Sequence, residues 1–218
     1  MFPCLLLAQE QKKKLLIIPI SKSNIRLSSL TEKNIAYNNI SPDSLNNFIL
    51  KTIDAELKEI FKDYTLRYFD EYNSAPTLTD SAYHLKLWSC FYFEGADSSM
   101  RNIKNSKGES MDSYHNNYYG CDLNTYGIEI IKQAITSSKC DYVLFINKFE
   151  IINPNSLFCL HVEVMDKNLN RIYGSKNELK KDISKTMYPD VLKYYIQQAN
   201  REQLTRLEQY FKNLFLFH

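Results

Sequence analysis

The sequence has few of the residues that mark fibrous, disordered or membrane-spanning proteins. It contains 5 glycines and 6 prolines in 218 residues, too few for a collagen-like or low-complexity chain. No apolar run approaches the roughly 20 residues that a helix needs to cross a bilayer. A transmembrane helix is therefore not expected, and the length suits a single globular domain with a sizeable core.

A strong charge of either sign is also missing. The chain has 27 basic and 25 acidic residues, a net charge of +2, and the two kinds are interspersed. Nucleic-acid binding depends mostly on a concentrated basic surface that neutralises phosphates. Nucleic acid is therefore not an expected partner.

The sequence contains none of the short motifs that identify common catalytic and metal sites. There is no GxGxxG, no phosphate-binding Gly-Lys-Ser/Thr loop, no HExxH and no GxSxG, so the usual nucleotide, zinc-protease and hydrolase signatures are lacking. We therefore predict no catalytic residue, no metal site and no cofactor.

The first residues resemble the end of a secretory signal. Leu5 to Leu7 precede Ala8, but a signal needs an apolar core of ~7–15 residues after a basic segment. We interpret residues 1–13 as a partial signal peptide and disordered tail whose start lies upstream of Met1. We expect a periplasmic or secreted protein. The alternative is a cytoplasmic protein whose N-terminus is frayed.

Cysteine usage leaves the redox state open. If Cys4 is removed with the leader, an even number of cysteines remains, which permits disulfides in an oxidising compartment. The spacing is wide and no CxxC is present. We expect small buried apolar side chains at Cys90, Cys121, Cys140 and Cys159.

Apolar periodicity predicts alternating strands and helices between residues 14 and 218. Ser41 and Pro42 open the clearest helix, because serine caps the first turn and proline suits its first position. Residues 21–40 are expected to form a loop with a helical turn. The predicted strands cover residues 15–20, 64–69, 140–152, 157–165 and 171–173. The predicted helices cover residues 42–61 and 125–138. A further helix is expected to begin at Thr79-Asp80, with Tyr83, Leu87, Trp88 and Phe91 facing the core. The last helix is expected to begin at Pro189 and to break near Asn200.

The hairpin around Asn153-Pro154 defines one candidate site. Pairing there predicts a core face that carries Val143, Phe145, Phe149, Leu160, Val162 and Val164. The opposite face gathers Lys148, Cys159, His161 and Glu163 beside Tyr142, Leu144 and Ile146. His161 and Glu163 point the same way, as a metal-binding or proton-transferring pair would. The alternative, which we favour, is a solvated sheet face with cross-strand charge pairs, and Cys159 is not expected to be a nucleophile.

The polar segment of residues 94–124 defines a second candidate. A loop of this length inside a compact domain is uncommon, and such loops are mobile or functional. Tyrosine supplies contact area and a polar tip for recognition. We therefore add Tyr114, Tyr118 and Tyr119 to Lys148, His161 and Glu163 as candidate binding residues.

A longer pattern spans residues 127–173. A helix leads to Cys-Asp-Tyr-Val-Leu-Phe-Ile at residues 140–146, and His-Val-Glu-Val-Met-Asp at residues 161–166 is followed by a turn before Arg171. The pattern resembles the small α/β domain of bacterial envelope proteins, namely the amino-terminal domain of the Tol translocation protein and the curli-secretion lipoprotein. Residues 94–124 depart from it. The resemblance implies an exported domain that binds other envelope components.

Together these features predict one α/β (α+β) domain over residues 14–218, with a single mixed sheet, a C-terminal antiparallel meander and helices packed on it. The expected function is that of an exported, non-enzymatic domain that makes protein contacts in the cell envelope through the tyrosine-containing segment or the end of the last helix. The alternatives are a periplasmic module for a small ligand and a hydrolase-type enzyme that uses His161 and Glu163.

Overall fold

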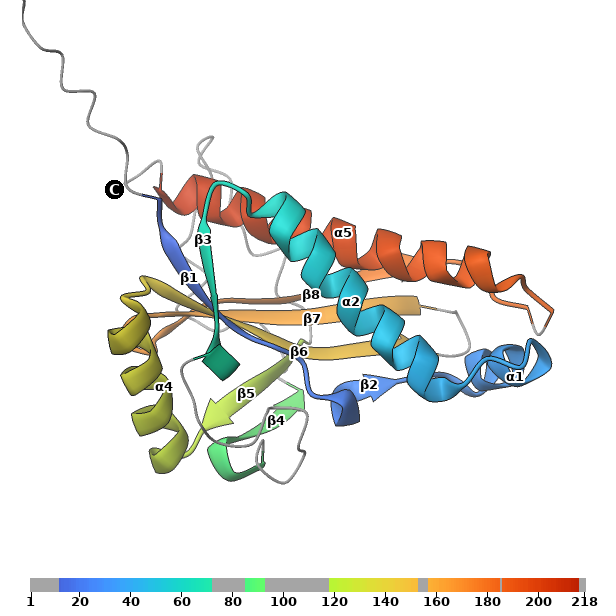
Figure 1. Ribbon diagram of the computed structural model, residues 1–218, viewed down its shortest axis with the longest axis horizontal. Coiled ribbons are helices and arrows are strands. Elements are labelled where there is room, and N and C mark those ends of the chain that lie inside the picture. Colours follow the sequence, from blue (N-terminus) through green and yellow to red (C-terminus); the bar gives the residue numbers. More distant parts are fainter. Residues whose placement is uncertain (1–11, 72–84, 93–117, 153–156, 185, 216–218) are drawn as a thin grey trace, which may run out of the picture.

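Two cores lie on the two faces of one mixed sheet. The computed structural model describes residues 12–71, 85–92, 118–152, 157–184 and 186–215. Two long helices cover one face of the sheet, and a two-stranded sheet with a further helix lies on the other (Figure 1). The predicted fold class is confirmed.

The main sheet combines a parallel part with an antiparallel meander. Its strand order is β3-β1-β6-β7-β8, and β2 pairs with β6. β1 runs parallel to β3 and β6, whereas β6, β7 and β8 pair antiparallel. β8 is longer than predicted because residues 174–180 continue to pair with β7. The strands are β1 (Lys14–Ile18), β2 (Ile25–Arg26), β3 (Thr65–Tyr68), β6 (Tyr142–Ile152), β7 (Leu157–Asp166) and β8 (Arg171–Lys180).

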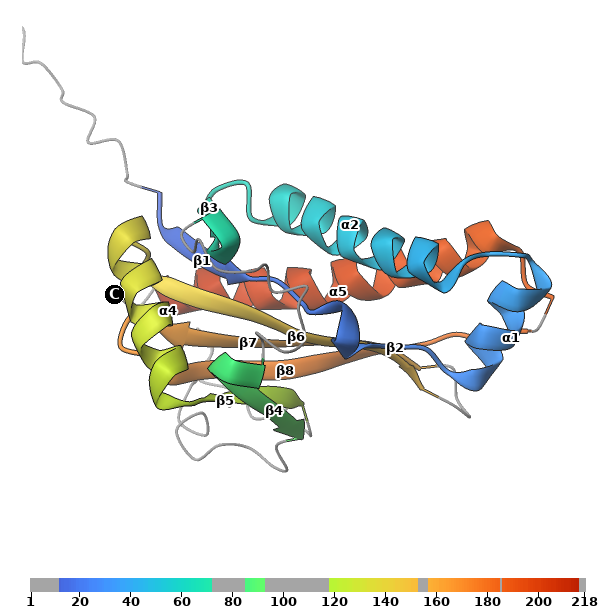
Figure 2. The same ribbon diagram turned by 60° about the horizontal axis from the view of Figure 1, so that its bottom comes forward.

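The helix that begins at Pro42 forms as its sequence predicts. The hydroxyl of Ser41 accepts a hydrogen bond from the Ser44 amide at 3.3 Å, which satisfies a first-turn donor. Leu45, Ile49 and Ile53 are buried on its inner face. This helix, α2 (Pro42–Ile60), lies beside α5 (Pro189–Phe215) on the same face of the sheet (Figure 2).

Two expectations about the other helices are wrong. α5 runs without a break through Asn200, because Ala199, Leu204 and Leu207 keep one continuous buried face and a single asparagine costs little helix propensity. The segment expected to be a loop contains α1 (Ser29–Tyr37), where the Ser28 hydroxyl accepts from the Thr31 amide at 3.2 Å. None of the helices in the described segments combines the length and apolarity needed to span a bilayer.

The opposite face carries β4 (Trp88–Tyr92), β5 (Tyr119–Leu123) and α4 (Thr125–Ser138). A helix was expected through Trp88 and Phe91, but helical structure ends at Leu87 and β4 begins at Trp88. β4 instead pairs antiparallel with β5, which was expected to be loop. This pairing joins segments about thirty residues apart, so local periodicity carries no sign of it. Residues 72–84 and 93–117 lie outside the described residues.

A β-bulge at Asn147 corrects the predicted faces of the hairpin. The register passes from the Ile146–Val162 pair to the Lys148–His161 pair, so Asn147 is an extra residue. Before the bulge, Val143 and Phe145 belong to the core beneath β4, β5 and α4. Tyr142, Leu144 and Ile146 pack instead in the core under α2 and α5, with Phe149, Leu160, Val162 and Val164.

The cysteines divide into two kinds. Cys90 and Cys121 form a disulfide that joins β4 to β5, so the expectation of simple buried side chains is wrong for these two. Cys140 and Cys159 are buried thiols as predicted. Burial raises the pKa of the Cys159 thiol to about 12, which favours the protonated thiol at neutral pH.

Candidate functional site

A row of charged and polar side chains lies buried between the main sheet and β5. We call it the polar row. Its members come from three adjacent strands of the meander, and five of the six are buried, whereas Arg171 is partly exposed. The row consists of Asn147, Lys148, Glu150, His161, Glu163 and Arg171.

His161 is held as a neutral imidazole. Its Nδ1 accepts a hydrogen bond from the Tyr119 amide at 2.9 Å, so the ring proton lies on Nε2, which donates to Glu150 Oε1 at 2.9 Å. Burial lowers the pKa of His161, while Glu150 opposes that shift. A second ring proton would face the Tyr119 donor and break this hydrogen bond.

Lys148 completes this end of the row. Its ammonium lies 2.5 Å from Glu150 Oε2 and 4.7 Å from the ring centroid of Tyr119, a distance at which a cation is attracted to the ring face. Burial lowers the pKa of Lys148, and the hydrogen bond to Glu150 opposes the shift. The Glu150 carboxylate therefore serves both a cation and an imidazole N–H.

Glu163 organises the other end of the row. Its Oε2 accepts from the Cys121 amide at 2.9 Å and from Asn147 Nδ2 at 3.2 Å, and its Oε1 pairs with Arg171 Nε. Burial raises the pKa of Glu163, whereas the Arg171 charge is the largest opposing influence. Arg171 also donates through Nη2 to the Cys121 carbonyl at 3.1 Å.

These contacts bind the backbone of β5. The amide and carbonyl of Tyr119 bond to His161 and Asn147, the latter at 2.9 Å, and those of Cys121 bond to Glu163 and Arg171. Four backbone groups that would otherwise be buried without partners are thereby satisfied. The polar row therefore supplies β5 with the backbone hydrogen bonds that a neighbouring strand supplies in a sheet.

This arrangement is suited to holding a strand rather than to transforming a substrate. His161 and Glu163 are each 0% exposed, and Lys148 is 1% exposed, so the expected solvated sheet face is wrong. The hydrogen bonds of His161 and Glu163 go to other row members and to β5. Among the described residues, no group of three or more histidine, cysteine or acidic side chains is placed to hold a metal ion.

The predicted site residues are only partly brought together. Lys148, His161, Glu163 and Tyr119 meet in the polar row. Tyr118 is buried one residue earlier, and its ring lies so close to Gly174 that a Cβ there would overlap it at 2.2 Å. Tyr114 lies outside the described residues.

Three members of the row were missed from the sequence. Glu150 follows Lys148 at the strand period of two, a signal that was available. Asn147 joins the row only through the bulge, and Arg171 only through its pairing with a residue of β7. Neither has a local sequence signal.

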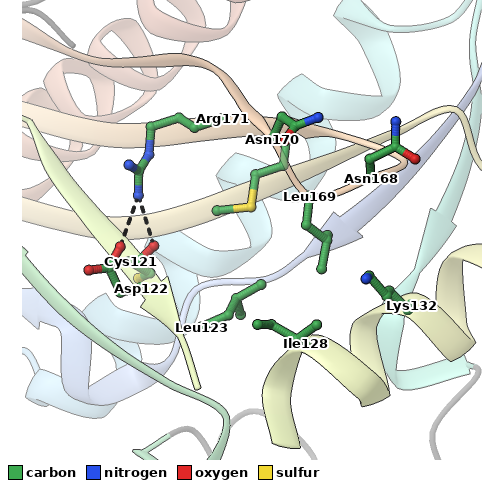
Figure 3. Close-up of a pocket in the computed structure, with 10 residues that line it drawn as sticks. Cys121, Asp122, Leu123, Ile128, Lys132, Asn168, Leu169, Asn170 and Arg171 are labelled. Carbon is green, nitrogen blue, oxygen red and sulfur yellow. Dashed lines mark hydrogen bonds and ion pairs between the residues drawn. The ribbon is translucent and has the colours of Figure 1, made fainter. Parts of the chain in front are cut away.

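An open pocket lies beside the polar row, between β5, α4 and the turn that joins β7 to β8 (Figure 3). Its volume is about 560 Å³. Arg171 lines the pocket and reaches Asp122 Oδ1 at 3.3 Å. The other lining residues are Cys121, Leu123, Ile128, Lys132, Met165, Asn168, Leu169 and Asn170.

Known proteins offer a likeness of fold at low identity. No protein-family model and no curated protein sequence matches the chain. The LpoB C-terminal domain from Salmonella enterica is 11% identical, over 78% of this chain and 83% of that one, with a TM-score of 0.34. A PelC dodecamer from Paraburkholderia phytofirmans is 10% identical, over 90% and 88%, with a TM-score of 0.33.

The lipoprotein GNA1162 from Neisseria meningitidis is 9% identical, over 89% of this chain and 99% of that one, with a TM-score of 0.34. All three are bacterial envelope proteins, the class that the sequence pattern resembles. Likeness at this level carries no argument about activity, ligand or partner.

Proposed function

We propose that this chain is an exported, non-enzymatic domain of the bacterial cell envelope that acts through contacts with another protein. The observation that carries the proposal is a gathering of exposed aromatic side chains at one end of the fold. The disulfide and the closed polar row support two of its parts, export and the absence of catalysis.

The disulfide supports export. Cys90 and Cys121 are bonded across paired strands, and structural disulfides persist in the periplasm and outside the cell but are rare in the cytosol. Protein trapped in intact cells with an alkylating agent should be modified after unfolding at Cys140 and Cys159 but not at Cys90 or Cys121. Modification of Cys90 and Cys121 as well would contradict export.

The polar row supports a non-enzymatic role. General acid–base catalysis needs a titratable group within hydrogen-bond reach of a substrate. His161 and Glu163, the pair on which an enzyme would depend, are covered by β5 and bonded to its backbone. Their hydrogen-bonding capacity is used in stabilising the fold.

The proposed contact surface is formed by α1 and the start of α5. Six large hydrophobic side chains of the described residues are exposed; three of them lie on these two helices, and a fourth directly precedes α5. Tyr188 is the most exposed, at 78%. We call this set the aromatic end; it comprises Tyr37, Tyr188, Val191 and Tyr194. Aromatic residues are enriched where proteins bind each other.

Side-chain hydrogen bonds join the two parts of the aromatic end. Asn34 Nδ2 donates to the carbonyls of Ser184 and Met187 at 2.8 and 3.0 Å, and Asn38 Nδ2 donates to Met187 at 3.1 Å. These bonds fix α1 to the segment that enters α5, so the two helices lie together at one end of the molecule (Figure 1). Preorganisation lowers the entropic cost of association.

The end of the last helix, the other surface expected from the sequence, is described only in part. Tyr210 and Phe211 are buried against α2 and the sheet, and residues 216–218 lie outside the described residues. The proposal therefore uses the start of the same helix.

Site-specific crosslinking in the cells that produce the protein tests the proposal. A photoreactive phenylalanine analogue at position 188 or 194 should yield one discrete crosslinked species. The matched control is position 126, because Tyr126 is an exposed tyrosine on α4 at the opposite end of the fold.

With the photoreactive residue at position 188, the same species should weaken when Tyr194 is changed to serine, and should persist in Tyr126→Ser. Equal crosslinking from positions 126 and 188, or no discrete species from either 188 or 194, would overturn the aromatic end as a contact surface.

A further inference from the structure

The pocket between β5, α4 and the β7–β8 turn separates charge at its two ends. Asp122 and Arg171 lie at one end and Lys132 at the other, with Leu123, Ile128 and Leu169 between them (Figure 3). Its volume of about 560 Å³ is within the range of ~300–1,000 Å³ found for small-molecule sites.

The Asp122 end has an excess of negative charge. Arg171 faces two carboxylates, Asp122 Oδ1 at 3.3 Å and the buried Glu163. One guanidinium therefore balances two anions, and the Asp122 carboxylate, which is 61% exposed, is accessible to a ligand cation.

The Lys132 end has an excess of positive charge. Lys132 is an exposed residue of α4, and among the described residues that line the pocket it is the one cation besides Arg171. A ligand anion at this end would lie near the Lys132 ammonium group. The carboxylate among the residues that line the pocket, Asp122, lies at the other end. The two ends thus favour opposite charges on one ligand.

Leu169 supplies an apolar wall at a conformational cost. Its φ of 67° is in the left-handed region, which residues other than glycine, asparagine and aspartate rarely adopt. Asp166 holds the turn by accepting from the Asn168 and Asn170 amides at 2.8 and 2.9 Å. Asparagine or glycine would suit the backbone at position 169, and asparagines occupy both neighbouring positions. Leucine stands there instead, as expected where its side chain has a function of its own.

We infer that this pocket binds a short apolar peptide with both termini free. Its ammonium group pairs with Asp122, its terminal carboxylate pairs with Lys132, and its side chains contact Leu123, Ile128 and Leu169. The inference does not depend on the aromatic end, which lies on other elements.

Calorimetric titration of the purified protein with tri-leucine, N-acetyl-tri-leucine and tri-leucine amide tests the inference. The free peptide should bind most tightly. Each blocked form should bind about two- to fivefold more weakly, the effect of losing one partly exposed ion pair.

Variants assign each terminus to its residue. Lys132→Ala should remove the penalty of amidation and leave that of acetylation, whereas Asp122→Asn should do the reverse. Leu169→Asn, which suits the left-handed backbone, should weaken all three peptides about tenfold while the protein stays folded. Lys51→Ala, an exposed position on the opposite face of the sheet, should change none of them.

Two results would overturn the inference. One is the absence of binding heat from tri-leucine at millimolar concentration. The other is equal affinity for the free and both blocked peptides, because the charged ends would then play no part. Neither result bears on the crosslinking from position 188, so the two proposals fail separately.

Discussion

Histidine 161 illustrates how hydrogen bonding decides the role of a residue. A histidine next to a glutamate and a lysine has the composition of a proton-transfer site. Here Nδ1 is committed to the Tyr119 amide and Nε2 to Glu150, so neither nitrogen is available to a substrate. The sequence predicted that Lys148, His161 and Glu163 share a face, but not that β5 covers them.

Replacing Glu163 should destabilise the fold strongly. Glu163→Gln removes the charge that pairs with Arg171 and replaces one of the two acceptor oxygens with an N–H donor, which then faces either Arg171 or the Cys121 amide. Loss of a buried charged partner costs about 3 kcal/mol or more. Urea unfolding should show this loss, whereas Glu178→Gln, a partly exposed partner of Lys176 on β8, should change stability by less than about 1 kcal/mol.

A loss below about 1 kcal/mol in Glu163→Gln would mean that the buried carboxylate is not an organising group. The comparison with Glu178 is direct, because both carboxylates pair with a cation on β8 and differ mainly in burial.

At the scale of elements, the Asn147 bulge places the polar and the apolar residues of β6 on opposite faces of the sheet. Without it, strict alternation would place Lys148 and Glu150 with Leu144 and Ile146. With it, Lys148 joins the polar row while Phe149 stays in the core under α2 and α5.

Deleting Asn147 and changing it to alanine should therefore have similar outcomes. Ile146 and Lys148 pair with the adjacent residues Val162 and His161, so the deletion joins them in a regular strand with every residue still on its own face, and we expect a cooperative thermal unfolding transition. Both variants lose the hydrogen bonds of Asn147 to Tyr119 and Glu163, a cost of about 1–3 kcal/mol. A deletion variant that does not fold would contradict the assigned register.

Local sequence signals predicted the elements that depend on local physics. Ser41 and Pro42 marked the start of α2, and the apolar period of residues 125–138 gave α4 with its bounds. β4 and β5 were missed because their pairing depends on distant contacts. The bulge was missed because one added residue leaves no compositional trace.

At the scale of the whole molecule, the buried row links stability to pH. Burial lowers the pKa of His161 in the folded protein, so the unfolded chain takes up the proton first as pH falls. The stability contributed by His161 is therefore complete above the unfolded pKa of about 6.5 and declines below it. Glu150, Lys148 and Lys176 are the charged groups around the ring.

The wild type should thus lose more thermal stability than His161→Gln between about pH 7.5 and about pH 5. Burial raises the pKa of Glu163, which acts in the opposite direction, but this effect is common to both proteins. Parallel midpoint curves for the two would show that His161 titrates alike in the folded and unfolded states.

Overall architecture and the meander followed from the sequence pattern, while the cover over the polar face did not. The disulfide and the row together attach β4 and β5 to the main sheet. That cover makes an apparent site part of the core, whereas the aromatic end and the open pocket are accessible.

The most direct test of this account is amide hydrogen exchange at Tyr119 and Cys121, followed by NMR. Both amides should be strongly protected in the wild type, and His161→Ala should speed exchange at Tyr119 about tenfold or more while the Ile17 amide in β1 keeps its protection. Exchange of both amides at the rate of an unfolded chain in the wild type would show that the polar row does not hold β5.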